Sequence, residues 1–375
     1  MADARVSVED NGDQQFSHRA IDNGNPTIYK PTWLVLDDIN VDLISYFELI
    51  AIVASVLFFG LPAVLALPMA AAFLLPLRLF LPRPKPPQGL VLITGASSGV
   101  GAELSYIFAE KGHDLILVGR NEEQLEAVKN NISERYARKT YTISADLSIP
   151  GAAQKLYDHV TERGFIVDVL VNGAALGGAG DTFEQPIELA EGMTTLNCTS
   201  LVVLSQLFGR DMIKRGRGWM LQISSVGGWM ASPGQNIYHA TKHYVRAFSE
   251  ALSVELRAYP GITNTQLMPG PVHTQFVTRA HADETVMMGV MGPGALEDPK
   301  AVAMAGYRGL CKGKREVFSS WNAAANALMM KMAPRSVHLT VASLMNAPTR
   351  GMARMREPEK DQRVRGEKLE MKREQ

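Results

Sequence analysis

A short apolar segment, a glycine-rich turn and a helical pattern follow one another directly between residues 89 and 111. Gly89–Thr94 (GLVLIT) is apolar almost throughout, as expected for a parallel strand buried on both faces. The turn Gly95–Gly101 (GASSGVG) comes next, and the helical pattern Ala102–Lys111 follows it. Glycines in such a turn let the backbone approach a pyrophosphate, and the helix N-terminus favours its negative charge. This order is therefore typical of a dinucleotide-binding unit.

Five further strand patterns alternate with helical patterns after this unit. The expected strands are Asp114–Gly119, Thr140–Ala145, Asp168–Val171, Trp219–Ser224 and Thr263–Met268. Asn121 is expected to cap the helix that follows the second strand, and Asn197 lies inside the helix that precedes the fifth. The alternation predicts an α/β fold with a doubly wound, Rossmann-like parallel sheet.

A second motif lies at the end of the stretch Ser225–Lys242. A long helix is expected from Tyr238 to about Ala258, so Tyr238 and Lys242 share one helix face. A tyrosine has a pKa near ~10, and a nearby cation lowers it towards the range useful for acid–base chemistry. Ser225 follows a predicted strand, which places its hydroxyl near Tyr238. Taken alone, a Tyr-x-x-x-Lys pair is more often a buried aromatic beside a solvated lysine, so the motif needs the glycine-rich turn for support.

An uncharged apolar run, Leu49–Leu77, precedes the predicted domain. It is longer than the ~20 residues that a helix needs to span a bilayer, and prolines interrupt it. A tilted, kinked single span is the first interpretation, a re-entrant hairpin the second, and a buried core helix the third. Acidic residues dominate before the run and basic residues follow it, including Arg78, Arg83 and Lys85. The positive-inside tendency then predicts a membrane anchor, in the endoplasmic reticulum, with the following domain in the cytosol.

Composition bounds the remaining possibilities. The chain has 375 residues with 38 basic and 38 acidic side chains, so nothing indicates nucleic-acid binding. Its two cysteines are far apart, and no cluster of His and Cys has metal-ligand spacing. We therefore expect neither a disulfide framework nor a metal site. The expected segments are an acidic, disordered tail (1–42), a transmembrane segment (43–81), a proline-rich linker (82–88), the cofactor domain (89–320), an apolar helical extension (321–350) and a charged tail (351–375).

Taken in order, the motifs of residues 89–320 resemble those of the short-chain dehydrogenase/reductase family. The matching segments are Thr94-Gly95-x-x-x-Gly99-x-Gly101, Asp146-Leu147, Asn172, Asn197, Ser225, Tyr238-x-x-x-Lys242 and Pro269-Gly270-Pro-Val272-x-Thr274. Two departures occur: Asn172-Gly-Ala-Ala175 replaces the usual Asn-Asn-Ala-Gly, and Thr241 stands where Ser is commoner. The region around Gly313–Phe318 and the helix Trp321–Pro334 are similar to the branch that reduces hydrophobic carbonyls.

The resemblance implies a role for each matching position. Tyr238 would be the general acid/base, Lys242 would lower its pKa and bind the nicotinamide ribose, and Ser225 would hold the substrate oxygen. Asn197 would support a water-linked proton path to Lys242, or else be a structural, helix-bending residue. Asp146 would contact adenine, although on sequence alone it is equally well a helix cap. The implied cofactor-binding residues are Thr94, Gly95, Ser97, Ser98, Gly99, Gly101, Arg120, Asp146, Leu147, Asn172, Tyr238, Lys242, Pro269, Gly270, Val272 and Thr274.

The end of the second predicted strand bears on the choice of cofactor. NAD enzymes typically place an acidic residue there, whereas this chain has Gly119-Arg120-Asn121. Arg120 can pair a 2′-phosphate in bidentate fashion, or simply be solvated. We therefore favour NADP(H) over NAD(H), and with it the reduction of a carbonyl.

The sequence thus predicts a membrane-anchored, NADPH-dependent oxidoreductase that interconverts a carbonyl and a secondary alcohol on a hydrophobic substrate of acyl, steroid, retinoid or secondary-metabolite type. A homo-oligomer is a further expectation. One alternative is a catalytically silent, NADP-binding membrane adaptor. Another is a serine hydrolase using Ser97, since Gly95-Ala-Ser97-Ser-Gly99 also matches the G-x-S-x-G elbow.

Two further segments of the C-terminal part of the chain bear on substrate and membrane binding. His273–Gly294 resembles a substrate lid, with Met287, Met288 and Met291 as an adaptable lining or as core residues. Trp321–Met345 is apolar with few charges, and either lies on a membrane surface or packs on the domain.

Overall fold

The computed structural model describes residues 86–259, 261–274, 296–332 and 334–345, and the description below is confined to them. Seven parallel strands form one sheet in the order β3-β2-β1-β4-β5-β6-β7. Their bounds are β1 Leu90–Thr94, β2 Leu115–Gly119, β3 Thr140–Ser144, β4 Val167–Asn172, β5 Gly218–Ile223, β6 Ile262–Met268 and β7 Glu316–Phe318.

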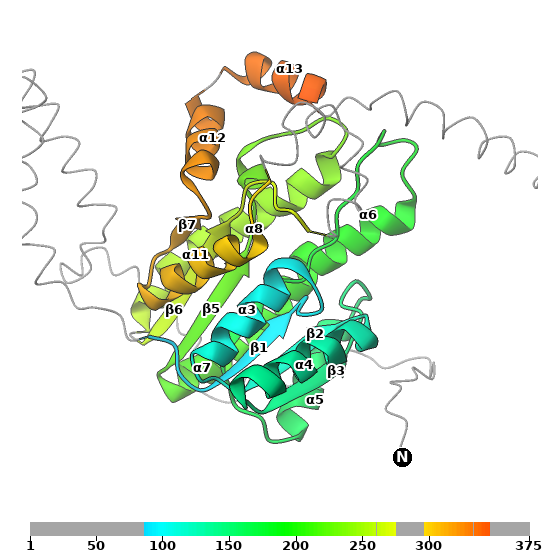
Figure 1. Cartoon of the computed structure of the whole chain (residues 1–375). Coiled ribbons are helices and arrows are strands. Elements are labelled where there is room, and N and C mark those ends of the chain that lie inside the picture. The colour runs from blue at the N-terminus through cyan, green and yellow to red at the C-terminus, as the bar shows by residue number, and fades with distance from the viewer. Residues whose placement is uncertain (1–85, 260, 275–295, 333, 346–375) are drawn as a thin grey trace, which may run out of the picture. The chain divides into compact units, whose positions relative to one another are not determined.

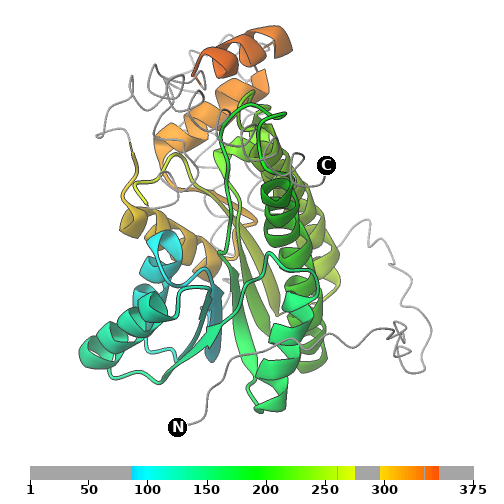
Figure 2. The same cartoon turned by 90° about the vertical axis from the view of Figure 1, so that its right-hand side faces the viewer.

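Helices cover both faces of this sheet (Figures 1 and 2). They are α3 Gly99–Glu110, α4 Glu122–Tyr136, α5 Ala152–Glu162, α6 Ile187–Thr194, α7 Leu201–Arg215, α8 Asn236–Glu255, α11 Pro299–Cys311, α12 Trp321–Met332 and α13 Arg335–Met345. Alternate side chains of the buried strands face opposite layers, as the period of a strand requires. Val91 and Ile93 pack with α3, α4 and α11, whereas Leu92 packs with α5 and α7.

The strand order reverses between β1 and β4, which both lie next to each other and run in the same direction. In open α/β sheets, ligands bind outside the carboxyl ends of the strands at such a switch point. The glycine-rich turn after β1 and the segment after β4 therefore meet at the edge where a cofactor is expected.

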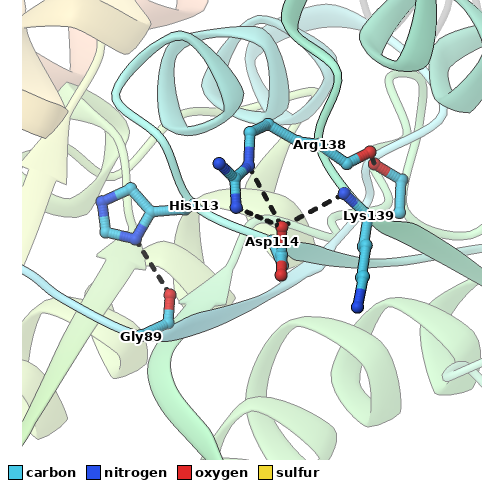
Figure 3. A network of polar contacts seen from close by, with 6 residues as sticks. Gly89, His113, Asp114, Arg138 and Lys139 are labelled. Atoms are coloured by element: carbon cyan, nitrogen blue, oxygen red, sulfur yellow. Dashed lines mark hydrogen bonds and ion pairs between the residues drawn. The ribbon is translucent and has the colours of Figure 1, made fainter.

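The opposite edge of the sheet is fixed by polar contacts (Figure 3). Asp114 Oδ1 accepts hydrogen bonds from Arg138 Nη2 at 2.7 Å, from Arg138 Nε at 3.1 Å and from the Lys139 amide at 3.1 Å. His113 Nδ1 lies 3.0 Å from the Gly89 carbonyl oxygen. These contacts tie the beginnings of β1, β2 and β3 together, so the amino ends of the strands are structural and the carboxyl ends are left for chemistry.

The predicted doubly wound parallel sheet is confirmed, and each predicted strand agrees with the observed one to within one or two residues. Asn121 caps α4 as expected, because its Oδ1 accepts from the Gln124 amide at 2.8 Å. The three-residue strand β7 was not predicted. Within the described ranges, no helix combines the length and apolar character needed to cross a bilayer. The run Leu49–Leu77 and both tails lie outside the described residues, as does most of the expected lid.

Candidate active site

The glycine-rich turn after β1 forms a close-packed cradle. A Cβ added at Gly101 would lie 2.2 Å from the carbonyl oxygen of Gly95, and one added at Gly95 would lie 2.8 Å from the Ala174 amide nitrogen. Gly95 and Gly99 have φ values of 71° and 56°, in the left-handed region that favours glycine. The turn therefore needs glycine both for its conformation and for the approach of neighbouring backbone, and α3 begins directly at its end.

Thr94 joins this turn to the segment that follows β4. Its Oγ1 accepts hydrogen bonds from the amides of Gly173 and Ala174, both at 3.1 Å. A Cβ at Gly173 would lie 2.8 Å from the Thr94 carbonyl oxygen, so the second residue of this Asn-Gly-Ala-Ala segment has no room for a side chain. The departure from the usual Asn-Asn-Ala-Gly is thus accommodated locally, and the two segments remain tied together.

Asn172 has a different place from the one expected. It is 3% exposed and does not line the cavity described below. Its Nδ2 donates to Ser205 Oγ at 3.0 Å and to Gln222 Oε1 at 2.9 Å. Gln222 in turn donates to Ser205 and to Asn264 at 3.1 and 3.2 Å. Asn172 is therefore part of a buried polar network beneath the site and not of the cavity lining. Its expected role in cofactor binding stays a prediction.

A cavity of about 620 Å³ lies along the carboxyl ends of the strands. It runs from the glycine-rich turn and the end of β2 to the beginning of α8. The expected site residues that line it are Gly95, Ser97, Ser98, Gly99, Gly101, Arg120, Asp146, Leu147, Ser225, Tyr238, Lys242, Pro269, Gly270, Val272 and Thr274. Thr94, Asn172 and Asn197 do not line the cavity but hold the segments that do.

Three side chains meet at the α8 end of this cavity. Tyr238 and Lys242 lie one turn apart on α8, with the Lys242 Nζ 5.7 Å from the centre of the Tyr238 ring. Ser225 follows β5 and its hydroxyl hydrogen bonds to the Tyr238 side chain. Lys242 is only 3% exposed, and its Nζ donates to the Ile223 carbonyl oxygen at 3.0 Å. The predicted convergence of Ser225, Tyr238 and Lys242 on one cleft is confirmed.

The direction of the Tyr238 pKa differs from the expectation. Burial raises the pKa of Tyr238 to about 12, and the hydrogen bond from Ser225 acts in the opposite direction. Burial also lowers the pKa of Lys242 from its ordinary value of 10.5 to about 8. Since both side chains are removed from water, each loses the solvation of its charged form, and neither the Ser225 hydrogen bond at Tyr238 nor Cys198 near Lys242 offsets this loss. Tyr238 is therefore held in its protonated form, which is the form that can donate a proton.

Asn197 connects the segment after β4 to α8. It lies in a short π-helical segment, Thr195–Ser200, between α6 and α7. Its Oδ1 accepts from the Leu176 amide at 2.9 Å, and its Nδ2 donates to the Leu176 carbonyl at 2.8 Å and to Thr241 Oγ1 at 2.9 Å. The π-helical geometry agrees with the helix-bending interpretation. Thr241, where Ser is commoner, keeps the hydroxyl that this contact requires.

Arg120 and Asp146 face each other at the other end of the cavity. Arg120 Nη1 lies 3.6 Å from Asp146 Oδ2, and the two side chains are 54% and 34% exposed. Asp146 Oδ1 also accepts from the Ser148 amide at 2.9 Å and from Ser148 Oγ at 2.6 Å. The helix-cap interpretation of Asp146 is wrong, because α5 begins after Gly151. An exposed guanidinium at this position is open to an anionic group on a ligand.

The loop after β6 closes the cavity from a third side. Pro269, Gly270, Val272 and Thr274 lie along it, and Gly99 is so close that its added Cβ would lie 3.0 Å from Thr274 Cγ2. Glu297 holds this loop: its amide donates to the Pro271 carbonyl at 2.8 Å, and its carboxylate accepts from the hydroxyls of Ser319 and Ser320. Sequence reasoning missed Glu297, because no pattern links it to a loop more than twenty residues earlier.

Several residues of the α8 end were also missed, and they form the surroundings that a substrate would meet. Leu176, Leu196, Met230, Gln235 and His239 line the cavity near Tyr238. His239 is 8% exposed, its Nδ1 lies 3.0 Å from the Met230 carbonyl oxygen, and burial lowers its pKa to about 4. It is therefore neutral at physiological pH. His239 could have been predicted as a cavity residue, because it directly follows Tyr238 in the sequence.

The serine-hydrolase alternative finds no support at Ser97. The nucleophile of a G-x-S-x-G elbow sits on a strained turn and needs a histidine within hydrogen-bond reach. In the described part of the chain, Ala137 is the non-glycine residue with positive φ, so Ser97 has ordinary backbone geometry. No side-chain hydrogen bond joins Ser97 to a histidine within those same ranges.

The residues present fit a nicotinamide dinucleotide. The glycine cradle leaves room for a pyrophosphate at the N-terminus of α3, where the exposed amides favour negative charge. Arg120 and Asp146 lie at one end of the cavity and the Ser225–Tyr238–Lys242 group at the other. A nicotinamide bound there would supply hydride chemistry, and Ser225, Tyr238 and Lys242 would be the side chains of this chain nearest to it.

Comparison with solved structures supports this fold. A short-chain dehydrogenase from Sphingobium yanoikuyae, solved in complex with NADPH, has 28% identity and a TM-score of 0.57, covering 66% of this chain and 97% of that chain. A structure described as giving insight into 7beta-hydroxysteroid dehydrogenase stereoselectivity has 23% identity and a TM-score of 0.60, covering 68% and 97%. The second likeness concerns the fold alone.

Comparison of the sequence gives relatives and a family. Dehydrogenase/reductase SDR family member 7B of Danio rerio is 30% identical over 258 residues, or 66% of this chain and 82% of the relative. Dehydrogenase/reductase SDR family member 7 of Homo sapiens is 31% identical over 198 residues, or 52% and 58%. The family model for short chain dehydrogenases matches residues 89–285. With that match and the site geometry in agreement, the chain belongs to the short-chain dehydrogenase/reductase family.

Proposed function

We propose that the protein is an NADPH-dependent, membrane-anchored oxidoreductase that interconverts a carbonyl and a secondary alcohol on a hydrophobic substrate. The observation that carries the proposal is the hydrogen bond between Ser225 and Tyr238, made beside buried Lys242 in the cavity that begins at the glycine cradle. In the direction of reduction, Ser225 orients the carbonyl oxygen and protonated Tyr238 donates to the oxygen as it gains negative charge. Lys242 stabilises the developing phenolate.

The surroundings of the catalytic end favour an apolar substrate. Leu176, Leu196 and Met230 line the cavity near Tyr238, and neutral His239 adds no charge. An acyl, steroid, retinoid or aromatic carbonyl compound meets this description. The test is a screen of NADPH oxidation by the detergent-solubilised full chain against those four classes. Carbonyl-dependent oxidation with at least one class is expected, and NADPH binding without turnover on any of them would favour the adaptor alternative.

Arg120 supports the preference for NADP(H), and its replacement by Ala is expected to weaken NADPH binding about tenfold with little effect on NADH. A charge-assisted hydrogen bond contributes about 1.5–3 kcal/mol, and the half-exposed guanidinium places Arg120 at the lower end of that range. The affinities are measured by fluorescence titration of each cofactor. Arg135→Ala, an exposed arginine of α4 that does not line the cavity, is the matched control.

A substitution at Asp146, the carboxylate that faces Arg120, gives a second test of the preference for NADPH. Asp146→Asn keeps the hydrogen bond to Ser148 but removes the carboxylate 3.6 Å from Arg120. It should shift preference further towards NADPH, because the carboxylate repels a phosphate bound at Arg120. Equal losses of NADPH and NADH affinity in Arg120→Ala would show that Arg120 does not read the phosphate.

The topology of the chain gives another prediction: residues 89–375 face the cytosol, because Arg78, Arg83 and Lys85 follow the apolar run. A C-terminal epitope tag should therefore be digested by protease in intact microsomes. The acceptor-type Asn131 is half-buried on α4, with its Nδ2 bonded to the Ala127 carbonyl at 2.9 Å, so glycosylation alone is a weaker reporter than expected from sequence. A protected tag, or a glycosidase-sensitive mass shift lost in Asn131→Gln, would reverse the assignment.

A further inference from the structure

The helices α12 and α13 present an apolar surface that the domain itself does not cover. Eight large hydrophobic residues of these two helices are exposed, among them Trp321 at 82%, Met332 at 76% and Leu344 at 65%. The others are Leu328, Met329, Val337, Leu339 and Val341. On α12, Trp321, Leu328 and Met332 are seven and four residues apart and so share one helix face. We call these eight side chains the α12–α13 apolar surface.

The buried side chains of the two helices show which way the α12–α13 apolar surface faces. Ala323 and Ala327 of α12 are 1% and 4% exposed, and His338 and Ala342 of α13 are likewise buried. Lys331 Nζ lies 5.5 Å from the centre of the Trp229 ring, which also carries Arg246 Cζ at 3.7 Å on its face. α12 is thus packed against the turn that follows Ser225, and its apolar stripe points away from the domain. In Figure 1 both helices lie at the top of the domain, whereas α5 lies at the bottom.

The charged residues from the beginning of α12 to Arg356 are all basic. Acidic and basic residues are equal in number overall, yet residues 321–356 contain no Asp or Glu. The same stretch carries Lys331, Arg335, Arg350, Arg354 and Arg356. A large exposed apolar patch marks an interaction site. Within α12 and α13 the charged side chains are Lys331 and Arg335, both cationic. An apolar surface on helices whose charges are cationic is complementary to one occupant in particular, the interface of an anionic lipid bilayer.

The remainder of the sequence favours the same occupant over a protein. The run Leu49–Leu77 is the segment expected to hold this chain at a bilayer, so a lipid surface is available to the domain at high effective concentration. We propose that the α12–α13 apolar surface docks on the anionic face of the membrane and orients the catalytic end of the cavity towards it. Met230 lines the cavity and directly follows Trp229, which Lys331 of α12 contacts. Docking of α12 on the membrane therefore brings the lipid that would hold an apolar substrate next to the site.

The test must be local, because flotation of the whole chain with vesicles would also report any anchoring by Leu49–Leu77. Trp321 is a natural reporter among the four tryptophans. The full chain is reconstituted in phosphatidylcholine–phosphatidylserine vesicles whose acyl chains carry bromine near the headgroup, and in matched vesicles without bromine. The fluorescence component that Trp321→Phe removes is expected to be quenched about twofold or more by bromine, since an interfacial helix buries its apolar face at that depth.

Matched substitutions assign the effect to the surface. Leu328 is 58% exposed and Ile166, in the loop before β4, is 56% exposed. Leu328→Glu should remove most of the bromine-dependent quenching of Trp321, whereas Ile166→Glu should leave it unchanged. Replacing phosphatidylserine by phosphatidylcholine should weaken the quenching, because Arg335 then loses its anionic partners. NADPH affinity and the thermal unfolding midpoint serve as checks that each variant is folded.

Other occupants give different results, each of which would overturn the proposal. Absence of bromine-dependent quenching of Trp321 excludes contact with lipid. A dimer in detergent that Leu328→Glu converts to monomers identifies the surface as an interface between two copies. Photo-crosslinking from position 328 to peptides of 49–77, in place of lipid, identifies the apolar run as the occupant. Carbonyl-dependent NADPH oxidation is measured separately, so failure of the docking proposal is distinguishable from failure of the proposed reaction.

Discussion

Replacing Tyr238 by Phe is expected to lower carbonyl-dependent turnover by about 10²–10⁴-fold, the range typical for loss of a general acid/base. The change removes one oxygen and keeps the ring, so packing against His239 and the width of the cavity are preserved. Burial holds the Tyr238 hydroxyl in its protonated form, and that proton has no equivalent in phenylalanine. Turnover is measured as carbonyl-dependent NADPH oxidation, and cofactor affinity separately by fluorescence.

Two further variants help to interpret the effect of Tyr238→Phe on turnover. Tyr244→Phe removes the same atom from a tyrosine of α8 that is 48% exposed, and it should leave both measurements unchanged. Ser225→Ala should lower turnover with little effect on cofactor affinity, because Ser225 hydrogen bonds to Tyr238 and, in the proposed mechanism, orients the substrate oxygen. If Tyr238→Phe turned over substrate at a near-normal rate with cofactor bound, the proposed acid would be wrong, and family membership would describe only the fold.

The fold was predictable because its strongest signals are local. β1 and β2 are almost wholly apolar, and β4 is apolar apart from Asp168 and Asn172, since a parallel strand covered on both faces exposes no polar side. The cap at Asn121 follows from side-chain chemistry within four residues. β7 escaped prediction because three residues at the edge of a sheet carry too little pattern, and only its pairing with β6 defines it.

The candidate site was predictable in outline and not in its supporting contacts. Spacing of i and i+4 was enough to bring Tyr238 and Lys242 together, and the glycine turn was enough to place the cradle. The roles of Thr94, Asn172 and Asn197 depend on partners far away in the sequence, such as Gln222 and Thr241. Their side chains support the segments that line the cavity without lining it themselves. Sequence spacing does not reveal such contacts.

The sign of the Tyr238 pKa shift shows the same limit in energetic terms. A sequence reveals that a cation lies one helical turn from the tyrosine, and so predicts a lowered pKa. It does not reveal how completely both groups are buried. Lys242 is 3% exposed and its own pKa falls to about 8, so loss of solvation is the largest influence on the pKa of both side chains.

Lys242→Met is expected to produce the second large effect, a fall in turnover of about a hundredfold or more together with weaker cofactor binding. Methionine has a similar length and is unbranched, so the core around α8 keeps its packing. What disappears is the ammonium group and its hydrogen bond to the Ile223 carbonyl oxygen at 3.0 Å. Above pH about 8 the wild-type turnover should also decline, because Lys242 then loses its charge, whereas the residual turnover of Lys242→Met should not follow that transition.

The pH dependence of the free energy of unfolding tests whether Lys242 is a desolvated ammonium group in the folded protein. The pKa of Lys242 falls from 10.5 to about 8 on folding, so between those values the unfolded chain binds more protons than the folded one. Stability therefore rises with pH across that window, by up to about 1.4 kcal/mol per pH unit. The difference in unfolding free energy between wild type and Lys242→Met should show this slope in urea titrations at a series of pH values. Lys155→Met, an exposed lysine of α5, should show none, and parallel curves for wild type and Lys242→Met would contradict a desolvated ammonium at this position.

The double variant decides whether Tyr238 and Lys242 act as one unit. If the ammonium works by stabilising the phenolate that forms as Tyr238 gives up its proton, then Lys242→Met has little left to remove once the hydroxyl is absent. The combined loss of turnover in Tyr238→Phe with Lys242→Met should then be clearly smaller than the product of the two single losses. The loss of cofactor affinity should nevertheless persist in the double variant, because that contribution of Lys242 does not pass through the tyrosine. Multiplicative losses in turnover would show instead that Lys242 serves only the cofactor and that Tyr238 donates its proton without help.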